Sequence, residues 1–323
     1  MASPATDLPT RPIGDGDDAL DVSVVGLGCN NFGWRLGLED TRSVLTAARE
    51  AGVTLLDTAD VYGGAASSEA LIGAAIEGHR DQFVVATKFG MQMGGDRVPD
   101  APRGSPRYIR WAIEGSLRRL RTDRIDLYQY HIPDGVTPIA ETLAALDELV
   151  AAGKVRWIGC SNFNAAELEE AKATAHELGL ARFVSLQNEY SLLERSIEAE
   201  VRPACERLGV AILPYYPLAS GLLSGKYRRE GELPAGARLR DRATVGTDAQ
   251  FGRIEALGEF ARARGVGVID VAIAALAAQP QVASVIAGAT RPEQVTANAA
   301  ALRWRPSPGD LAEIDRIAPS GRR

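Results

Sequence analysis

Four residues of this chain carry side chains that together could deliver a proton to a substrate. Asp57, Lys88 and His131 each follow a short apolar run, and Tyr62 comes five residues after Asp57. A phenol titrates near pH 10 in water, so it is a poor acid at neutral pH unless its neighbours shift its pKa. A buried lysine paired with an aspartate favours the phenolate. We therefore predict that Lys88 lowers the pKa of Tyr62.

The same four residue types suggest hydride transfer to a carbonyl group. His131 could hydrogen-bond a carbonyl oxygen and orient it, and Tyr62 would then protonate the alkoxide that forms. Side chains do not donate hydride, so this chemistry requires a nicotinamide cofactor. A Schiff-base aldolase that uses Lys88 as its nucleophile is an alternative, but pairing with Asp57 argues against a lysine free to attack.

Strands and helices that alternate along the chain would bring these residues together. Eight such units over about 300 residues predict a parallel sheet closed into a single-domain α/β fold, the (β/α)8 TIM barrel, with catalytic groups at the C-terminal ends of the strands. An open doubly wound sheet is the main alternative. The predicted strands cover residues 23–28, 53–56, 83–87, 125–130, 155–159, 183–186, 210–213 and 282–287. The predicted helices cover residues 41–51, 67–77, 106–121, 137–152, 164–178, 195–208, 254–264 and 269–278.

Residues 26–31, Gly-Leu-Gly-Cys-Asn-Asn, resemble the start of a dinucleotide-binding fingerprint. Asn31 stands where the third glycine of that fingerprint is needed, so the match is incomplete. A classical Rossmann site is therefore not expected, which also favours the barrel over the open sheet.

Two long connections, residues 90–105 and 216–251, follow the third and seventh predicted strands. Loops of this length in a compact domain are usually lids or binding loops, and these two would lie at the C-terminal face. The second loop is rich in arginine and is predicted to close over a bound cofactor. Those arginines are Arg228, Arg229, Arg238 and Arg240. We expect a polar lead-in over residues 1–20, the barrel over 21–318 and a polar tail over 319–323.

Composition excludes several classes of partner. The chain has 323 residues, is 46% hydrophobic and carries a net charge of −6, so nucleic acid and anionic membranes are not expected partners. Residues 1–20 hold no apolar signal segment, and no apolar run reaches membrane-spanning length. The scattered Cys29, Cys160 and Cys205 suit a reducing cytoplasm and show no metal-site spacing. The expected protein is cytoplasmic, without a metal, and either a monomer or a homo-oligomer.

Several motifs make the chain resemble the aldo-keto reductases over essentially its whole length. They are Leu-Asp-Thr-Ala-Asp-Val-Tyr-Gly at 56–63, Ala-Thr-Lys-Phe-Gly at 86–90, Tyr-Gln-Tyr-His at 128–131, Gly-Cys-Ser-Asn-Phe at 159–163, Gln-Asn-Glu-Tyr at 187–190 and the run at 215–227 that begins Tyr-Tyr-Pro-Leu-Ala-Ser-Gly. The family tetrad of Asp, Tyr, Lys and His maps onto Asp57, Tyr62, Lys88 and His131. The chain is also similar to the β-subunits of voltage-gated potassium channels, a branch whose members bind NADPH and a channel.

The resemblance implies NADPH-dependent reduction of an aldehyde or ketone to an alcohol, with Tyr62 as general acid. Two alternatives stay open: a nucleotide-binding sensor barrel with a protein partner, and a sugar (aldose) dehydrogenase that runs in the oxidative direction. In all three cases the resemblance implies an extended dinucleotide over the barrel mouth. Ser161, Asn162 and Gln187 would hold its carboxamide, and Tyr215 would stack on its nicotinamide ring. The other implied cofactor residues are Gly28, Tyr216, Pro217, Leu218, Ser220, Gly221, Lys226, Gly288, Thr290, Arg291, Gln294 and Asn298.

A helix is predicted to begin after the last strand, and its start would bind an anion. Thr290 with Glu293 three residues later is a capping-box pattern. Arg291 could pair with a 2′-phosphate, which favours NADPH over NAD as cofactor, and Asn298 matches the family's adenine contact. Gly288, at a position that is basic in many relatives, and Ala297, in place of an acid, weaken that preference.

The sequence does not identify the class of substrate. The predicted pocket walls are apolar and aromatic, which suits aromatic aldehydes, quinones, sugars and ketosteroids about equally well. These wall residues are Phe32, Trp34, Phe89, Met91 and Trp111.

Overall fold

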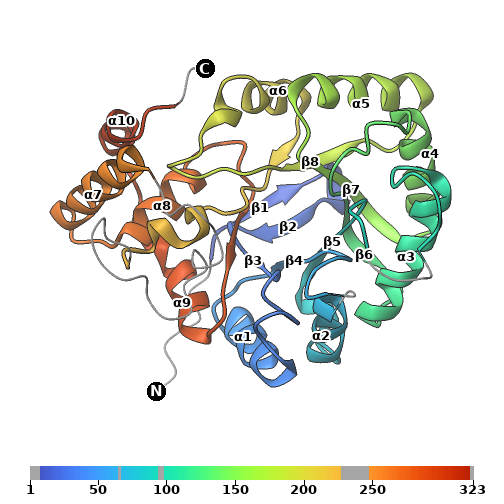
Figure 1. The fold of residues 1–323 in the computed structure, drawn as a ribbon, viewed down its shortest axis with the longest axis horizontal. Coiled ribbons are helices and arrows are strands. Elements are labelled where there is room, and N and C mark those ends of the chain that lie inside the picture. Colours follow the sequence, from blue (N-terminus) through green and yellow to red (C-terminus); the bar gives the residue numbers. More distant parts are fainter. Residues whose placement is uncertain (1–7, 65–66, 94–97, 227–246, 321–323) are drawn as a thin grey trace.

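Parallel strands form the centre of the molecule, and helices surround them (Figure 1). The computed structural model describes residues 8–64, 67–93, 98–226 and 247–320. Within them an eight-stranded parallel sheet has the order β10-β3-β4-β5-β6-β7-β8-β9. The strands are β3 (Val25–Gly28), β4 (Leu55–Asp57), β5 (Val84–Phe89), β6 (Ile125–Tyr130), β7 (Val155–Ser161), β8 (Phe183–Gln187), β9 (Ala211–Ile212) and β10 (Val285–Gly288).

The first and last strands of this order meet, so the sheet closes into a barrel. Isolated bridges join Ile212 to Val282 and Tyr215 to Ile286. The backbone N–H of Ile286 donates to Pro214 O at 2.9 Å. The predicted single-domain (β/α)8 barrel is confirmed.

Each strand of the barrel is followed along the chain by one or more helices on the outside of the barrel. These are α1 (Leu38–Glu50), α2 (Ser67–Ala75), α3 (Pro106–Leu120), α4 (Ile139–Ala151), α5 (Ala165–Leu178), α6 (Val201–Leu208), α7 (Asp248–Ala263), α8 (Val268–Ala277), α9 (Pro292–Ala300) and α10 (Pro308–Ile317). Local sequence explains several ends. Asn164 and Glu167 form a capping box before α5, and Gly179 ends that helix with φ +65°.

Some predicted boundaries were wrong. The strand predicted over residues 210–213 is only two residues long, and the helix predicted over 195–208 is split into the 3₁₀ turn η3 (Ser196–Glu198) and α6. Helix α7 begins at Asp248, inside the predicted loop, because Thr247 and Gln250 form a capping box there. Helix α10 is not among the predicted elements, although Ser307 and Asp310 cap it in the same way.

Part of the predicted polar lead-in folds as a hairpin that seals the N-terminal end of the barrel. Strands β1 (Thr10–Ile13) and β2 (Leu20–Ser23) pair antiparallel and lie across the ring of strands (Figure 1). Ile13, Leu20 and Val22 are buried among side chains of the barrel interior. Arg11 fixes the hairpin by donating to Ala277 O at 2.7 Å, Gln279 O at 3.2 Å and Val282 O.

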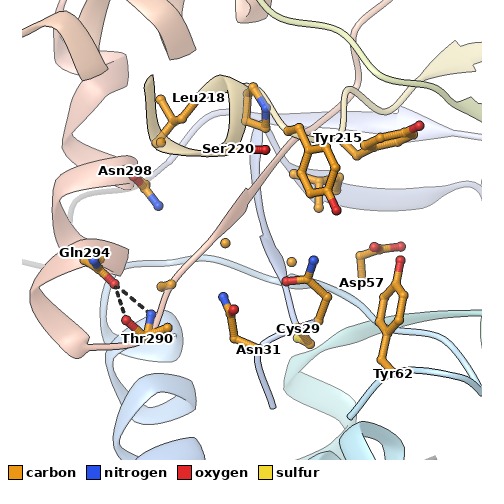
Figure 2. A pocket seen from close by; sticks show the side chains of 18 of the residues that line it. Cys29, Asn31, Asp57, Tyr62, Tyr215, Leu218, Ser220, Thr290, Gln294 and Asn298 are labelled. Carbon is orange, nitrogen blue, oxygen red and sulfur yellow. Dashed lines mark hydrogen bonds between the residues drawn. The ribbon is translucent and has the colours of Figure 1, made fainter. Parts of the chain in front are cut away.

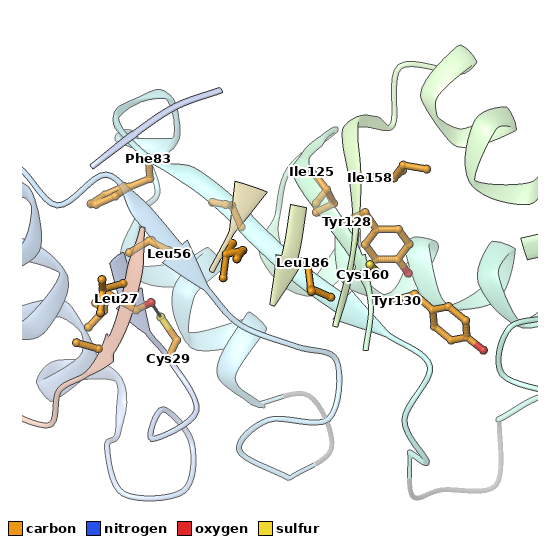
Figure 3. Close-up of a cluster of buried hydrophobic side chains, with 14 of the residues drawn as sticks. Leu27, Cys29, Leu56, Phe83, Ile125, Tyr128, Tyr130, Ile158, Cys160 and Leu186 are labelled. Atoms are coloured by element: carbon orange, nitrogen blue, oxygen red, sulfur yellow. Dashed lines mark hydrogen bonds between the residues drawn. The ribbon is translucent and has the colours of Figure 1, made fainter. Parts of the chain in front are cut away.

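The largest apolar core lies between the strands and the outer helices (Figure 3). Alternation along each strand sends one set of side chains inward and the next outward. Outward-facing Tyr128 and Tyr130 therefore stack on Phe89, at centroid distances of 4.9 and 5.1 Å, while their neighbour Gln129 faces the barrel interior. This core fixes the strands whose ends carry the site.

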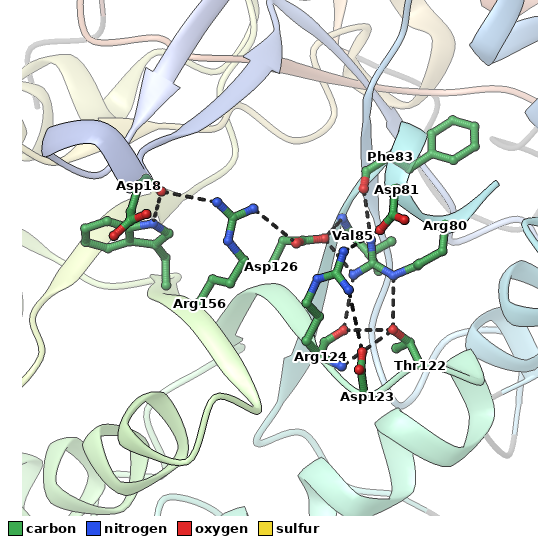
Figure 4. A network of polar contacts seen from close by, with 11 residues as sticks. Asp18, Arg80, Asp81, Phe83, Val85, Thr122, Asp123, Arg124, Asp126 and Arg156 are labelled. Carbon is green, nitrogen blue, oxygen red and sulfur yellow. Dashed lines mark hydrogen bonds and ion pairs between the residues drawn. The ribbon is translucent and has the colours of Figure 1, made fainter.

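A polar network supports the start of these strands from the opposite end (Figure 4). Asp126 of β6 is buried and accepts hydrogen bonds from the backbone of Val85 at 2.8 Å and from Arg80 Nη2 at 2.7 Å. Arg156 of β7 reaches the same carboxylate at 3.4 Å and also donates to Asp18 O in the hairpin. The carboxylate of Asp126 thus links β5, β6 and β7 to the hairpin and fixes their relative positions.

Candidate active site

A buried ion pair lies at the C-terminal ends of β4 and β5. Lys88 Nζ lies 2.8 and 2.7 Å from the two carboxylate oxygens of Asp57 and 3.0 Å from Thr58 O. Lys88 is fully buried and Asp57 is 3% exposed. Burial by itself would lower the pKa of Lys88, but Asp57 and Tyr62 raise it above its usual value. The lysine is therefore held as a cation.

Two buried amides complete the surroundings of Asp57. Gln187 Nε2 donates to Asp57 Oδ1 at 2.8 Å and also approaches Gln129 Oε1 at 3.3 Å, and Gln129 Nε2 lies 3.2 Å from the same carboxylate oxygen. Three donors thus fix the carboxylate in one orientation. Gln129 was not among the predicted site residues, although it shares the inward face of β6 with His131.

Tyr62 lies above this ion pair on the loop after β4. Lys88 Nζ is 5.0 Å from the centre of its ring. Lys88 lowers the pKa of Tyr62 as predicted, but burial raises it by more, so the net pKa of Tyr62 lies above its usual value of 10. The cost of desolvating a phenolate depends on how deeply the ring is placed, and local sequence does not reveal that depth.

His131 follows β6 and faces the same space as Tyr62. The two rings stand edge to face, with centroids 5.7 Å apart. Burial, and then the charge of Lys88, lower the pKa of His131 to about 3. Its Nδ1 is buried without a hydrogen-bond partner among the described residues. His131 is therefore a neutral imidazole, which suits a hydrogen-bond donor better than a counter-charge.

Tyr62 and His131 line a cavity of about 790 Å³ at the C-terminal face, and Figure 2 shows Tyr62 beside Asp57 at one end of it. Lys88 lies beneath its wall rather than in it. The structure brings into this wall every described residue that the resemblance implied for the cofactor. They are Gly28, Ser161, Asn162, Gln187, Tyr215, Tyr216, Pro217, Leu218, Ser220, Gly221, Lys226, Gly288, Thr290, Arg291, Gln294 and Asn298.

Near Tyr62, the polar side chains of the wall are already bonded to one another. Asn162 has φ +59°, and its Nδ2 donates to His131 O at 2.9 Å. Its Oδ1 accepts from the phenol of Tyr215 at 2.8 Å, and Ser161 Oγ donates to Gln187 O at 2.7 Å. The Tyr215 ring is thereby fixed over the ends of β7 and β8.

The segment after Tyr215 has an unusual backbone. Tyr216, Ala219 and Ser220 have φ values of +53°, +47° and +59°, and Gly221 follows at +98°. Non-glycine residues rarely adopt such φ values, and clusters of them often mark ligand-binding segments. The loop then continues through exposed Lys226. Arg228, Arg229, Arg238 and Arg240, and with them most of the predicted lid, lie outside the described residues.

Helix α9 begins differently from the prediction. Its N-cap is Arg291, because Pro292 takes the first helical position. The predicted capping box of Thr290 with Glu293 is therefore wrong. Gln294 is the residue that reaches back from the first turn to Thr290. Its Oε1 accepts from Thr290 N at 2.7 Å and from Thr290 Oγ1 at 3.1 Å. Exposed Arg291 stands at the helix start, where the first N–H groups have no partner within the helix.

Most of the predicted substrate walls were wrong. Phe32 and Phe89 are fully buried in the outer core, and Trp111 packs against that core. Trp34 is 56% exposed and does not line the cavity, whereas Met91 does. The lining also includes several residues that were not predicted: Cys29, Asn30, Asn31, Arg35, Ile132, Ser224, Ile269, Ile286, Ala289, Glu293 and Ala297.

Comparison with known proteins gives the family. A model of the aldo/keto reductase family matches residues 24–319. The chain belongs to the aldo/keto reductase family. It is 34% identical over 327 residues to probable aldo-keto reductase 1 of Glycine max, covering 98% of this chain and 91% of the relative. A probable voltage-gated potassium channel subunit beta of Oryza sativa subsp. japonica is 33% identical over 320 residues, covering 94% and 95%.

A solved structure supports the same grouping. The glycerol dehydrogenase AKR11B4 from Gluconobacter oxydans superposes with a TM-score of 0.82 at 29% identity, covering 95% of this chain and 94% of that one. An uncharacterized oxidoreductase, YrpG of Bacillus subtilis (strain 168), is 35% identical over 288 residues, or 87% of each chain. These aldo/keto reductase relatives indicate a carbonyl oxidoreductase. None of the helices in the described part of the chain is long and apolar enough to span a membrane.

Proposed function

We propose that this protein is an NADPH-dependent oxidoreductase that reduces an aldehyde or ketone to an alcohol, with Tyr62 as the proton donor. The observation that carries the proposal is the convergence of Tyr62 and neutral His131 on one cavity wall, directly above the buried Lys88–Asp57 pair. Two side chains that can donate hydrogen bonds then face the same part of the cavity, which suits a carbonyl oxygen that gains negative charge.

The cavity has features that fit an extended dinucleotide. It runs from Tyr62 to Asn298, and Asn298 is 5% exposed with no hydrogen bond from its amide to the described residues (Figure 2). Lys226 and Arg291 line it, and α9 points its first turn toward it. The residues present therefore fit the cofactor, whose dihydronicotinamide would supply the hydride.

Each residue of the tetrad then has a separate role in the proposed reaction. His131 Nε2 orients the carbonyl oxygen, and Tyr62 transfers its phenolic proton to that oxygen as negative charge develops. The resulting phenolate is stabilised by the ammonium of Lys88, which Asp57 keeps charged and in place. Ser161, Asn162 and Gln187 would orient the carboxamide of the cofactor, and Tyr215 would cover the face of its ring.

A direct assay tests the proposal. Purified protein is mixed with NADPH and a panel of aldehydes and ketones, and the loss of the reduced nicotinamide absorbance is followed. We expect turnover with at least one class of carbonyl, and at least about a hundredfold slower turnover with Tyr62→Phe at the same concentration. Tight NADPH binding without turnover of any panel member would instead support the sensor function suggested by the channel-subunit relative.

A second candidate is the oxidative direction on a polyol or aldose, because the superposed structure is described as a glycerol dehydrogenase. The same site would work in reverse, with the Tyr62 phenolate accepting the hydroxyl proton. Initial rates with NADP⁺ and glycerol or aldoses, compared with rates of carbonyl reduction, decide between the two directions.

A further inference from the structure

Asn31 is a buried polar residue of the cavity to which neither the tetrad nor the implied cofactor set gives a role. It is 6% exposed and lines the cavity two residues beyond Cys29. Its backbone carbonyl accepts from Arg35 N at 2.8 Å and from Leu36 N at 3.2 Å, which fixes the tight turn after β3. The position of the side chain is therefore set by the backbone rather than by bonds of its own.

The amide of Asn31, like that of Asn298 at the far end of the cavity, has no hydrogen-bond partner among the described residues, whereas four other amides of the site are bonded. Gln129, Gln187 and Asn188 each donate to a neighbouring oxygen, and Asn162 bonds on both sides. The amide atoms of Asn31 are not among the fully buried side-chain atoms that lack a partner, so they stay accessible from the cavity. This amide faces the cavity, so a ligand can supply the missing partner.

The surroundings of Asn31 leave room for that ligand. Gly28 and Gly288 are register partners at the ends of β3 and β10, and together they form a floor without side chains. A Cβ atom placed on Gly288 would lie 3.5 Å from Asn31 Nδ2 and 3.8 Å from Gly28 O. The N–H₂ end of the Asn31 amide therefore stands directly beside this two-glycine floor.

The position of Asn31 along the cavity indicates which part of a dinucleotide it would meet. In Figure 2 it lies between the Tyr62 and Asp57 end and the Thr290, Gln294 and Asn298 end, with Ser220 on the opposite side. With the nicotinamide at the first end and the adenosine at the second, the middle of the molecule is its diphosphate.

We propose that the side-chain amide of Asn31 donates a hydrogen bond to the diphosphate of the bound dinucleotide where it crosses the Gly28–Gly288 floor. This rests on the proposed function, since it requires that the cavity binds a dinucleotide. Asn31 stands where the fingerprint requires its third glycine. It would then bind the diphosphate, the same group that such a fingerprint binds, through its side chain instead of a backbone N–H.

The test compares dissociation constants, measured by titration calorimetry, for NADPH and for adenosine 2′-phosphate, which lacks the diphosphate. Asn31→Leu should weaken NADPH by about tenfold to a hundredfold, the loss of one hydrogen bond to a charged group, and leave adenosine 2′-phosphate within about twofold. Asn31→Asp keeps the side-chain shape but places a carboxylate against the diphosphate, so it should weaken NADPH further than Asn31→Leu. Gln82→Leu, an exposed amide at the other end of the barrel, is the matched control.

Each other outcome overturns the proposal. If Asn31→Leu binds NADPH as tightly as the wild type, the amide makes no such bond. If Asn31→Asp binds as well as the wild type, the partner is a hydroxyl group and not a phosphate. A wild type that binds no dinucleotide removes the proposed function as well, whereas the first two results remove this proposal alone. Thermal melts of each variant by circular dichroism show that it is folded.

Discussion

The imidazole of His131 is nearly perpendicular to the phenol ring of Tyr62, at an interplanar angle of 84°. Both rings face the cavity, and Lys88 lies behind the phenol, 5.0 Å from its centre. A substrate oxygen can therefore contact both ring systems from one side while the charge that supports them stays inaccessible to solvent.

Removing the phenolic oxygen of Tyr62 should abolish most of the turnover. We expect Tyr62→Phe to lower kcat by at least about a hundredfold, the low end for loss of a general acid, with the Kd for NADPH nearly unchanged. Tyr128→Phe is the matched control, because the buried hydroxyl of Tyr128 lies in the outer core and has no hydrogen-bond partner in the described part of the chain. Similar kcat values for the two variants would rule out Tyr62 as the proton donor.

Removing one member of the buried ion pair should cost stability as well as activity. Lys88→Met leaves the Asp57 carboxylate buried without its cation, so the free energy of unfolding should fall by about 3–5 kcal/mol. Adding Asp57→Asn to that variant should restore part of the loss, because no unpaired charge is left, while turnover stays low. Urea denaturation and the carbonyl assay measure the two effects. Equal stability of the single and double variants would contradict the coupling.

The pH dependence of the two directions should differ. The pKa of Tyr62 is raised above 10 and that of His131 is lowered to about 3, so Tyr62 keeps its proton and His131 stays neutral between about pH 6 and 9. Reduction uses the phenol, so its kcat should be flat over that range. Oxidation uses the phenolate, whose fraction rises about tenfold per pH unit below the pKa, so its rate should climb. A limb near pH 6.5 in the reduction profile would show that His131 ionises.

Arg291 should determine the preference for NADPH. It caps the start of α9 beside the cavity, where a guanidinium can pair with a 2′-phosphate. Arg291→Ala should weaken NADPH by about 1.5–3 kcal/mol and leave NADH nearly unaffected, as measured by calorimetry with both cofactors. Arg316→Ala, an exposed arginine of α10 outside the cavity lining, should change neither. Equal losses for NADPH and NADH, or a wild type that prefers NADH, would remove this role.

The sequence predicts the placement of the tetrad well because the ends of the strands can be identified from its pattern of apolar residues. Asp57, Lys88 and His131 lie at or next to the ends of adjacent parallel strands, and period-two alternation directs them inward together. The same alternation explains the failure for Phe89. As the neighbour of inward-facing Lys88 it must point outward, and it packs against Tyr128 and Tyr130 instead of a substrate.

Other features depend on burial, which sequence patterns report poorly. The raised pKa of Tyr62 reflects the depth of its ring, and the closeness of Gly28 to Gly288 depends on barrel closure between segments some 260 residues apart. Asn31 had a local signal, its place in an incomplete glycine pattern. In the sequence, the absence of the third glycine is a clearer signal than the presence of the Asn31 amide.

The hairpin that seals the barrel can complete its packing only late in the synthesis of the chain. Arg11 emerges from the ribosome early, yet the carbonyl groups that bind it belong to residues 277, 279 and 282, separated from it by 266 to 271 positions. Loops of that length are slow to close, so Ile13, Leu20 and Val22 stay without their full enclosure until nearly the whole chain has been made. During that interval the nascent chain exposes apolar surface that chaperones recognise, and a chain cut short before residue 277 would lack all three carbonyl groups that bind Arg11.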